Sequence, residues 1–328
     1  MSSDSTQIRV LVTGVGAIIG QGVVKSLRRL PGLHIVGLDR DPQAFGRHAC
    51  DAFHVKPALA ETDPVYDRFL LDLLEREAID LVLPCIEQDV FHFDARRPLF
   101  TTSRAAVALN DSRLINLARD KWSLHLALLE AGLPAIPSSL ASDWALLQEQ
   151  LGPAPLLCKP RLGSGGRGQA LVESEDDLRY QLRKQGDNFM LQRLVGSADE
   201  EYTVGLFGYG DGQSSRPAIL QRTLGPGGAT WRARSVADDP LIESACAALT
   251  AHFRPLGPTN YQFRKADGQV WLLEINPRLS ASVSLRAALG FNEAAMCIDY
   301  FCHGQRPPLA EWRAARCTRY IEDHIEFL

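Results

Sequence analysis

The chain has 328 residues, of which 45% are hydrophobic and 23% are charged, as in a globular protein with two or three domains. The formal net charge of -4 argues against a basic nucleic-acid-binding surface. No apolar run approaches the roughly 20 residues of a membrane span. There is no signal-peptide pattern, and the seven cysteines form no CxxC pair, so we expect a cytoplasmic protein with reduced thiols.

The first predicted domain, residues 1–113, has the pattern of a parallel α/β sheet. Strands at 8–13 and 34–39 flank a helix that follows a glycine-rich turn at 14–20. The second strand ends in Asp39, which completes a layout typical of dinucleotide-binding folds. The turn has two interpretations. It binds NAD(P), or its glycines only allow a tight turn and close helix packing.

The next predicted units are a helix at 64–76 and a strand at 79–84. Glu87 follows at the carboxyl end of that strand, where open α/β sheets bind ligands. It is therefore a candidate substrate residue. The alternative is a carboxylate that only stabilises a helix N-terminus.

Residues 114–190 combine a helix with a glycine-rich loop. The helical pattern at 111–130 contains Lys121, and a short strand ends at Lys159. The loop at 161–168 is rich in backbone N–H groups, which suit a phosphate cover next to a lysine. It is not a Walker A loop, because the lysine precedes the glycines. The alternative is a plain hairpin loop.

Residues 191–328 are predicted to form the ligand-binding sheet. A strand ending near Gln192 leaves backbone groups for an adenine edge, and Glu201 is placed to bind a ribose hydroxyl or the metal shell. After the strand that ends at Arg222, we expect a flexible loop at 224–234 that closes over an anionic substrate.

The most informative stretch is a predicted buried strand at 270–275 that leads into Asn276-Pro-Arg278. Side chains alternate along a strand, so Glu274 and Asn276 point the same way. Carboxylate and amide oxygens suit Mg²⁺. The alternative is an edge strand with solvated ends.

The partner strand at 260–265 fixes what faces Glu274. A two-residue turn at Asp267 and Gly268 places Gln262 opposite Leu273, whereas a three-residue loop places it opposite Glu274. We predict the three-residue loop at 267–269. Gln262, Glu274 and Asn276 then form one magnesium–nucleotide site.

Together these residues resemble the ATP-grasp superfamily, most closely the branch related to the carbamoyl phosphate synthase large chain and the pyrrolysine-biosynthesis ligase. The resemblance extends from Ile8 to about Phe301. It rests on Asp120-Lys121, Lys159-Pro160 with the glycine loop, Gln192 with Glu201-Tyr-Thr-Val, Asn260-x-Gln262, and Glu274-Ile-Asn276-Pro-Arg278. The sequence departs from the pattern at Leu279-Ser-Ala-Ser282, where relatives often carry glycines, and the hydroxyls of Ser280 and Ser282 become candidate substrate contacts.

The resemblance implies a fold and a set of roles. It implies a Rossmann-like pre-ATP-grasp domain with a parallel sheet (1–113), then a two-part ATP-grasp fold with antiparallel sheets, divided into a lid subdomain (114–190) and a C-terminal subdomain with the Mg-ATP site (191–328). The implied ATP contacts are Lys121, Lys159, Gly163, Ser164, Gly165, Gly166, Gln192, Arg193, Leu194 and Glu201. The implied ligands of Mg²⁺, or of Mn²⁺, are Gln262, Glu274 and Asn276, and the candidate catalytic residues are Arg278 and Arg222.

The activity implied is an ATP-dependent carboxylate–amine ligase that works through an acyl phosphate. A single set of ATP-site residues argues against an enzyme that phosphorylates twice. The alternatives are a carboxyphosphate-forming enzyme or small-acid kinase of the superfamily, an NAD(P)-binding oxidoreductase, and a non-catalytic nucleotide-binding module. The expected partners are a small carboxylic acid and an amine, and a homodimer is compatible with the sequence.

Overall fold

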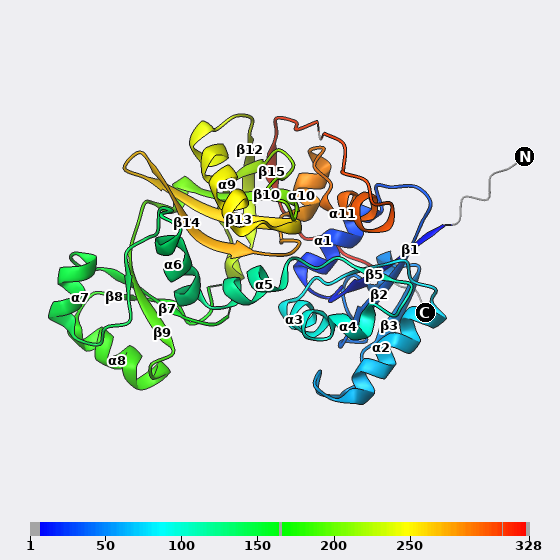
Figure 1. Ribbon diagram of the computed structural model, residues 1–328, viewed down its shortest axis with the longest axis horizontal. Helices are drawn as coiled ribbons and strands as arrows, with labels where there is room; N and C mark the ends of the chain where they lie inside the picture. The colour runs from blue at the N-terminus through cyan, green and yellow to red at the C-terminus, as the bar shows by residue number, and fades with distance from the viewer. Residues whose placement is uncertain (1–6, 164–165, 310, 326–328) are drawn as a thin grey trace, which may run out of the picture.

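The computed structural model describes residues 7–163, 166–309 and 311–325, and three sheets organise them (Figure 1). The first is a parallel sheet in the order β3-β2-β1-β4-β5. Its strands are β1 (Ile8–Thr13), β2 (Leu33–Asp39), β3 (Ala52–Val55), β4 (Leu81–Leu83) and β5 (Ala106–Val107). The helices of this part are α1 (Ile18–Leu27), α2 (Pro64–Arg76), α3 (Glu87–Ala95) and α4 (Arg97–Phe100). The predicted parallel α/β sheet is therefore confirmed.

The glycine-rich turn after β1 serves packing. The Oδ2 atom of Asp39 accepts a hydrogen bond of 2.7 Å from the amide of Gly16, one of the N–H groups that a dinucleotide phosphate uses. A Cβ atom on Gly20 would lie 2.2 Å from the carbonyl oxygen of Gly14. These contacts favour the structural interpretation of the turn over the NAD(P)-binding one.

The second sheet is antiparallel, with the order β6-β9-β7-β8. It consists of β6 (Ser138–Ser139), β7 (Leu156–Pro160), β8 (Ala170–Val172) and β9 (Phe189–Arg193), covered by α7 (Trp144–Leu151) and α8 (Glu175–Gln185). Leu147, Leu156 and Leu178 are buried in its small core. Ser174 caps α8, because its hydroxyl accepts from the amide of Asp177 while that carboxylate accepts in return.

The third sheet has six strands in the order β14-β13-β10-β11-β12-β15. Their bounds are β10 (Glu201–Tyr209), β11 (Ala218–Leu224), β12 (Thr230–Val236), β13 (Leu256–Ala266), β14 (Gln269–Asn276) and β15 (Arg316–Thr318). The accompanying helices are α9 (Pro240–Phe253), α10 (Val283–Ala288) and α11 (Glu293–Cys297). The predicted flexible loop at 224–234 is thus partly wrong, because its second half is strand β12. Only the residues before Thr230 connect the two strands.

The predicted helix at 111–130 is two helices, α5 (Ser112–Arg119) and α6 (Lys121–Glu130). The break falls at Asp120, which has an extended backbone and whose carboxylate accepts from the amide of Trp122. Lys121 is therefore the first residue of α6, not an interior helical residue as the sequence suggested.

The hairpin that carries the predicted metal ligands has the expected pairing but a different turn. Gln262 lies opposite Glu274 as predicted, yet the turn has two residues, because Ala266 pairs with Gln269. A β-bulge supplies the missing residue, since Phe263 pairs with Leu272 and Leu273 is skipped. The predicted three-residue loop is therefore wrong.

The parallel sheet and the six-stranded sheet are joined by a common hydrophobic core. Helix α1 lies against α10 and α11, and Val23 belongs to the same buried cluster as Val283 and Phe291. Figure 1 shows the parallel sheet and the four-stranded sheet at opposite ends below the six-stranded sheet. Within the described residues, every helix is too short or too polar to cross a bilayer.

Candidate functional site

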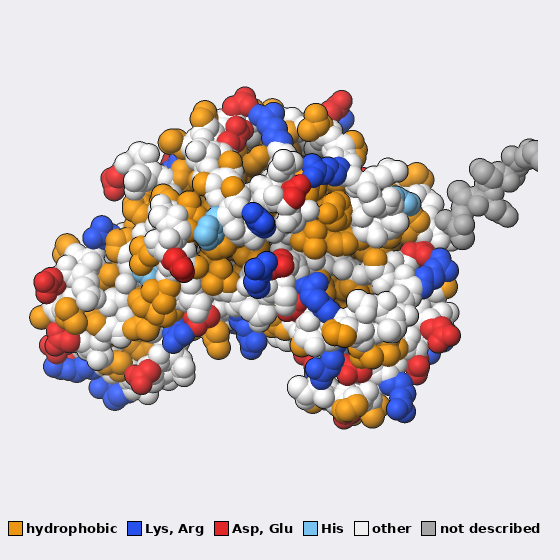
Figure 2. Space-filling model, viewed as in Figure 1, with side chains coloured by type: hydrophobic (Ala, Val, Ile, Leu, Met, Phe, Trp, Pro, Cys, Tyr) orange, Lys and Arg blue, Asp and Glu red, His pale blue; other side chains and the backbone are white. Residues whose placement is uncertain are grey.

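A cleft of about 490 Å³ lies where the three sheets meet. The parallel sheet contributes residues from the start of α1 and α3, including Ile18 and Glu87. The four-stranded sheet contributes Lys159 and Gln192, and the six-stranded sheet contributes the middle of β13 and the end of β14. Figure 2 shows the molecule hollowed between its two lower parts, below the six-stranded sheet.

Lys159 is a buried cation that lines the cleft. Its Nζ atom donates a 2.7 Å hydrogen bond to Oε1 of Gln192, whose amide nitrogen donates to Ser138. Burial lowers the pKa of Lys159 to about 8, and the carboxylate of Glu274 partly opposes that shift. An ammonium group held this way is ready to receive an anion.

Lys121 lies beside the glycine loop. Its Nζ atom donates a 2.6 Å hydrogen bond to the carbonyl of Gly163, and its amide donates to the carbonyl of Arg161. Arg161 also forms an ion pair with Asp120, so the start of α6 is tied to the loop. Burial lowers the pKa of Lys121, while Glu274 acts in the opposite direction. The two cleft lysines therefore share a nearby carboxylate.

Glu201 is held by two arginines. Its Oε1 atom accepts from Arg222 at 2.8 Å and its Oε2 atom accepts from Arg264 at 2.9 Å. Arg222 also donates to Oε1 of Gln262 at 2.8 Å. Both carboxylate oxygens are thus already bonded, which weighs against a ribose contact through Glu201. Arg264 was not singled out from the sequence, because an arginine on a strand has no motif of its own.

The predicted metal ligands face the cleft, and their donor set fits Mg²⁺. Gln262, Glu274 and Asn276 all line it. Within the part of the chain that the structure describes, no three His, Cys, Asp or Glu side chains gather into a metal cluster. One carboxylate with amide oxygens suits an ion that takes its other ligands from phosphates and water. The oxygen of Gln262 already accepts one hydrogen bond, from Arg222, and keeps a second lone pair for a metal ion.

Arg278 connects two sheets across the cleft. Its Nη2 atom lies 3.2 Å from Oε1 of Glu87, the first residue of α3, and its Nη1 atom donates to the carbonyl of Leu279. Glu87 therefore occupies a helix N-terminus and also lines the cleft, and its contact with a substrate stays a prediction.

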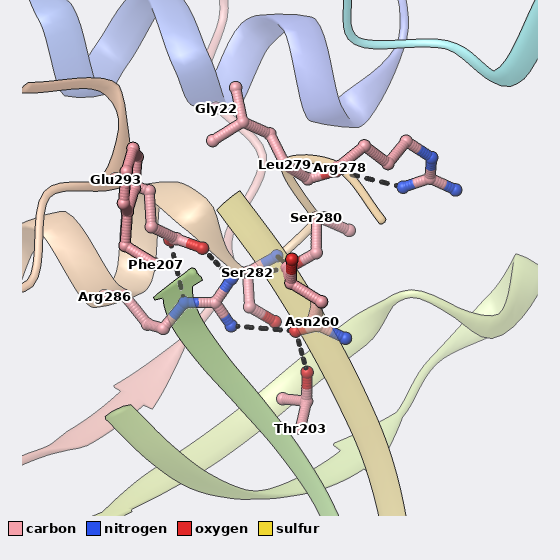
Figure 3. A network of polar contacts seen from close by, with 12 residues as sticks. Gly22, Thr203, Phe207, Asn260, Arg278, Leu279, Ser280, Ser282, Arg286 and Glu293 are labelled. Carbon is pink, nitrogen blue, oxygen red and sulfur yellow. Dashed lines mark hydrogen bonds and ion pairs between the residues drawn. The ribbon is translucent and has the colours of Figure 1, made fainter. Parts of the chain in front are cut away.

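A buried polar network lies behind the segment 278–280, which follows β14 (Figure 3). Arg286 and Glu293 form an ion pair with no exposed side-chain surface. Arg286 donates further to Asn260 and to Ser280, both of which line the cleft. Sequence reasoning missed this pair, because an arginine inside a helical pattern is usually solvent-facing.

The structure brings nearly all the predicted site residues together. Those lining the cleft are Glu87, Lys121, Lys159, Gly166, Gln192, Arg193, Leu194, Glu201, Arg222, Gln262, Glu274, Asn276, Arg278, Ser280 and Ser282. Gly163 lines a smaller adjoining cavity of about 180 Å³. Ser164 and Gly165 lie outside the described residues.

The chain is similar in sequence to proteins of known family. A family described as ATP-grasp in the biosynthetic pathway with Ter operon matches residues 187–323. The formate-dependent phosphoribosylglycinamide formyltransferase of Bordetella parapertussis is 26% identical over 300 residues, which is 83% of this chain and 69% of that protein.

Two solved structures have a similar fold. The N5-carboxyaminoimidazole synthetase of Staphylococcus aureus aligns with a TM-score of 0.71 at 17% identity, over 93% of this chain and 80% of that one. The biotin carboxylase domain of the Hydrogenobacter thermophilus 2-oxoglutarate carboxylase, solved with MgADP, ADP and bicarbonate, aligns with a TM-score of 0.71 at 14% identity, over 93% and 72%. At these identities the likeness is one of fold.

Proposed function

We propose that this chain, which belongs to the ATP-grasp superfamily, is an ATP-dependent ligase that joins a small carboxylic acid to an amine. The observation that carries the proposal is the convergence of Lys121, Lys159, Glu274, Asn276 and Arg278 on one cleft, from α6, β7, and β14 with the turn after it. A nucleotide triphosphate needs such cations beside a magnesium-binding carboxylate. The relatives support the same chemistry, since one is a formate-dependent formyltransferase by name.

We propose three functional units. Residues 1–113 supply one wall of the substrate cleft, 114–190 act as the lid over ATP, and 191–328 carry the Mg-ATP site. The lid assignment is supported by Lys159 and Gly166, which face the cleft from the four-stranded sheet. Use of Mn²⁺ in place of Mg²⁺, assembly into a homodimer and a cytoplasmic location remain predictions from the sequence.

The first proposed step is attack of a carboxylate oxygen on the γ-phosphorus of ATP, which breaks the bond to the β-phosphate and releases ADP. Lys121 and Lys159 carry the positive charge that meets the phosphates. Arg278 lines the same cleft and stabilises the transferring group once it leaves Glu87. Mg²⁺, held by Glu274 and Asn276, would neutralise phosphate charge.

In the second step the amine attacks the acyl carbon of the acyl phosphate, and inorganic phosphate and a proton leave. Water competes with the amine for this intermediate, so the cleft must be closed. Gly166, Arg167 and the connection before β12 line the cleft and are the segments we propose to close it. Glu87, on the far wall, is the residue we propose to receive the amine.

The proposal is tested by measuring ADP release from Mg-ATP with pooled carboxylic acids, with and without pooled amines. A ligase releases ADP fastest when both pools are present. ADP release at the same rate with acids alone identifies the small-acid kinase instead. Absence of ATP binding contradicts the whole assignment.

A further inference from the structure

One wall of the cleft carries two polar side chains that a buried arginine holds in place. Asn260 on β13 and Ser280 after β14 line the cleft and are nearly fully buried, with exposures of 0% and 6%. Both contact Arg286, which is itself fully buried. The inference that follows rests on the proposed phosphorylation of a carboxylate.

Arg286 is held in one orientation. Its Nε and Nη2 atoms donate to the two oxygens of Glu293 at 2.9 and 2.8 Å, which is a bidentate pair. A Cβ atom on Gly205 would collide with the guanidinium group, so only glycine on β10 leaves room for it. The remaining donors of Arg286 point at Asn260 and Ser280.

The orientation of the Asn260 amide follows from this. Arginine only donates, so the atom of Asn260 that lies 3.1 Å from Arg286 Nη1 must be the oxygen, Oδ1. The hydroxyl of Thr203 donates to the same oxygen at 2.8 Å. The amide nitrogen, Nδ2, is buried and has no partner within the described residues, and in Figure 3 it points away from Arg286.

Ser280 is constrained in the same sense. Its hydroxyl oxygen accepts from Arg286 Nη2 at 2.8 Å and from the amide of Ser282 at 3.3 Å. Two donated bonds occupy its acceptor positions, which leaves its proton free to donate. The wall therefore offers hydrogen-bond donors to the cleft, while its acceptors are taken by Arg286.

We propose that Asn260 and Ser280 form a donor-only subsite for the carboxylate that is phosphorylated, with Arg286 and Glu293 as positioning residues. A carboxylate only accepts hydrogen bonds, whereas an amine or ammonium group needs acceptors. The acid therefore binds on this side, next to Asn276. The amine binds on the Glu87 side, where a carboxylate is available.

The test uses acetate as the probe and saturation-transfer difference NMR on the full chain with Mg-ADP bound. Wild type is expected to give an acetate signal. Asn260→Asp keeps the acceptor for Arg286 and Thr203 but places a second oxygen where Nδ2 stood. We expect at least a tenfold loss of acetate binding from protein that still binds Mg-ADP. Ser280→Ala should weaken acetate several-fold.

The matched control is Asn116→Asp, the same change at an exposed position of α5. It should bind acetate as wild type does. Equal acetate binding by Asn260→Asp and wild type overturns the subsite, and so does the absence of an acetate signal from wild-type protein that binds Mg-ADP. Failure of Mg-ADP itself to bind contradicts the proposed function instead, so the two failures are distinguishable.

Discussion

Lys159 carries the charge that the proposed chemistry needs, at a cost in solvation. It is 6% exposed, and burial lowers its pKa to about 8. Its ammonium group has the Gln192 oxygen as its one hydrogen-bond acceptor among the described residues. A bound phosphate supplies the missing charge, so ATP should raise the pKa of Lys159 and bind best to the protonated form.

The first prediction is the pH dependence of ATP binding. The protonated form of Lys159 predominates below its pKa of about 8, so the Kd of Mg-ATP should stay nearly constant there. Above that pKa, binding must take up a proton, and the Kd should rise by about tenfold per pH unit. Isothermal titration calorimetry from pH 6.5 to 9.5 measures this profile.

Lys159→Met should remove that pH dependence. It should also weaken binding by about 1.5–3 kcal/mol, the value of a hydrogen bond to a charged group. Lys184→Met, the same change at an exposed position of α8, is the control and should leave the Kd unchanged. A retained pH profile in Lys159→Met would show that another group titrates.

The second prediction concerns Glu274, the one carboxylate of the proposed metal site. Glu274→Gln is expected to abolish Mg²⁺-dependent ADP release, because a neutral amide binds Mg²⁺ far more weakly than a carboxylate does. Its unfolding midpoint should equal that of wild type. The readout is a Mg²⁺ titration of ADP release, with Glu130→Gln at the exposed end of α6 as the control. Near-normal turnover would contradict the metal assignment.

At the scale of elements, the break between α5 and α6 ties the start of α6 to the glycine loop. Asp120 caps α6, and Arg161 reaches it from the strand that leads into the glycine loop. Burial opposes ionisation of Asp120, but hydrogen bonds from Arg161 and from the Trp122 amide outweigh it and lower its pKa. The same junction holds Lys121 against Gly163.

The third prediction follows from that junction. Asp120→Ala should destabilise the protein by about 1 kcal/mol through the lost cap, with ~0–1 kcal/mol more from the partly exposed ion pair. It should also raise the KM for ATP, because Lys121 loses its fixed position. Asp120→Asn keeps the cap and should recover most of the stability. Urea unfolding and steady-state kinetics measure both effects.

The contribution of the Asp120 carboxylate to stability should decrease as the pH falls. A carboxylate with a lowered pKa stabilises the fold above its unfolded pKa, and that stability is lost as the pH falls through the folded pKa. The difference between wild type and Asp120→Ala should therefore shrink below about pH 4. A difference that grows on acidification would contradict the ion pair.

Sequence reasoning succeeded where the local pattern decides the element. The helix predicted at 64–76 matches α2, whose first turn begins with Asp63 and Pro64. It failed at the hairpin turn and at β12. The bulge at Leu273 depends on pairing with β13, and β12 forms because β11 and β15 offer it partners. Neither is encoded in a short stretch of residues.

The ion pair of Arg286 and Glu293 behind the cleft could not be predicted from a local pattern either. Lys159, Glu274 and Asn276 were found because motifs and strand alternation point to them. Arg286 and Glu293 were missed, because their burial comes from tertiary packing of α10 and α11 against β10 and α1. The sequence therefore identifies the motif and strand residues that line the cleft better than the buried pair behind them.

At the scale of the whole molecule, the cleft exists because the parallel sheet is docked on the six-stranded sheet. Gly22 of α1 faces Val283 of α10, and a Cβ atom there would lie 3.0 Å from that side chain. Asn110 completes the junction, since its amide donates to Thr259 and its oxygen accepts from the Leu256 amide. The distance between the Glu87 and Arg278 walls depends on this packing.

The fourth prediction is that Gly22→Leu wedges the two parts apart. Overpacking of this kind costs about 1–3 kcal/mol, and the KM for the acid and amine should rise more than the KM for ATP, because only the substrate side uses both walls. Lys25→Leu places the same side chain on the exposed face of α1 and is the control. Equal effects of Gly22→Leu on all three KM values would contradict the two-wall description.

The central claim is that a substrate carboxylate attacks the γ-phosphate of ATP. The most direct measurement uses an acid labelled with ¹⁸O in its carboxyl group and follows the inorganic phosphate released during amide formation by mass spectrometry or ³¹P NMR. The acyl-phosphate mechanism predicts that one ¹⁸O atom per turnover moves from the acid to the phosphate. Amide formation with unlabelled phosphate would contradict it.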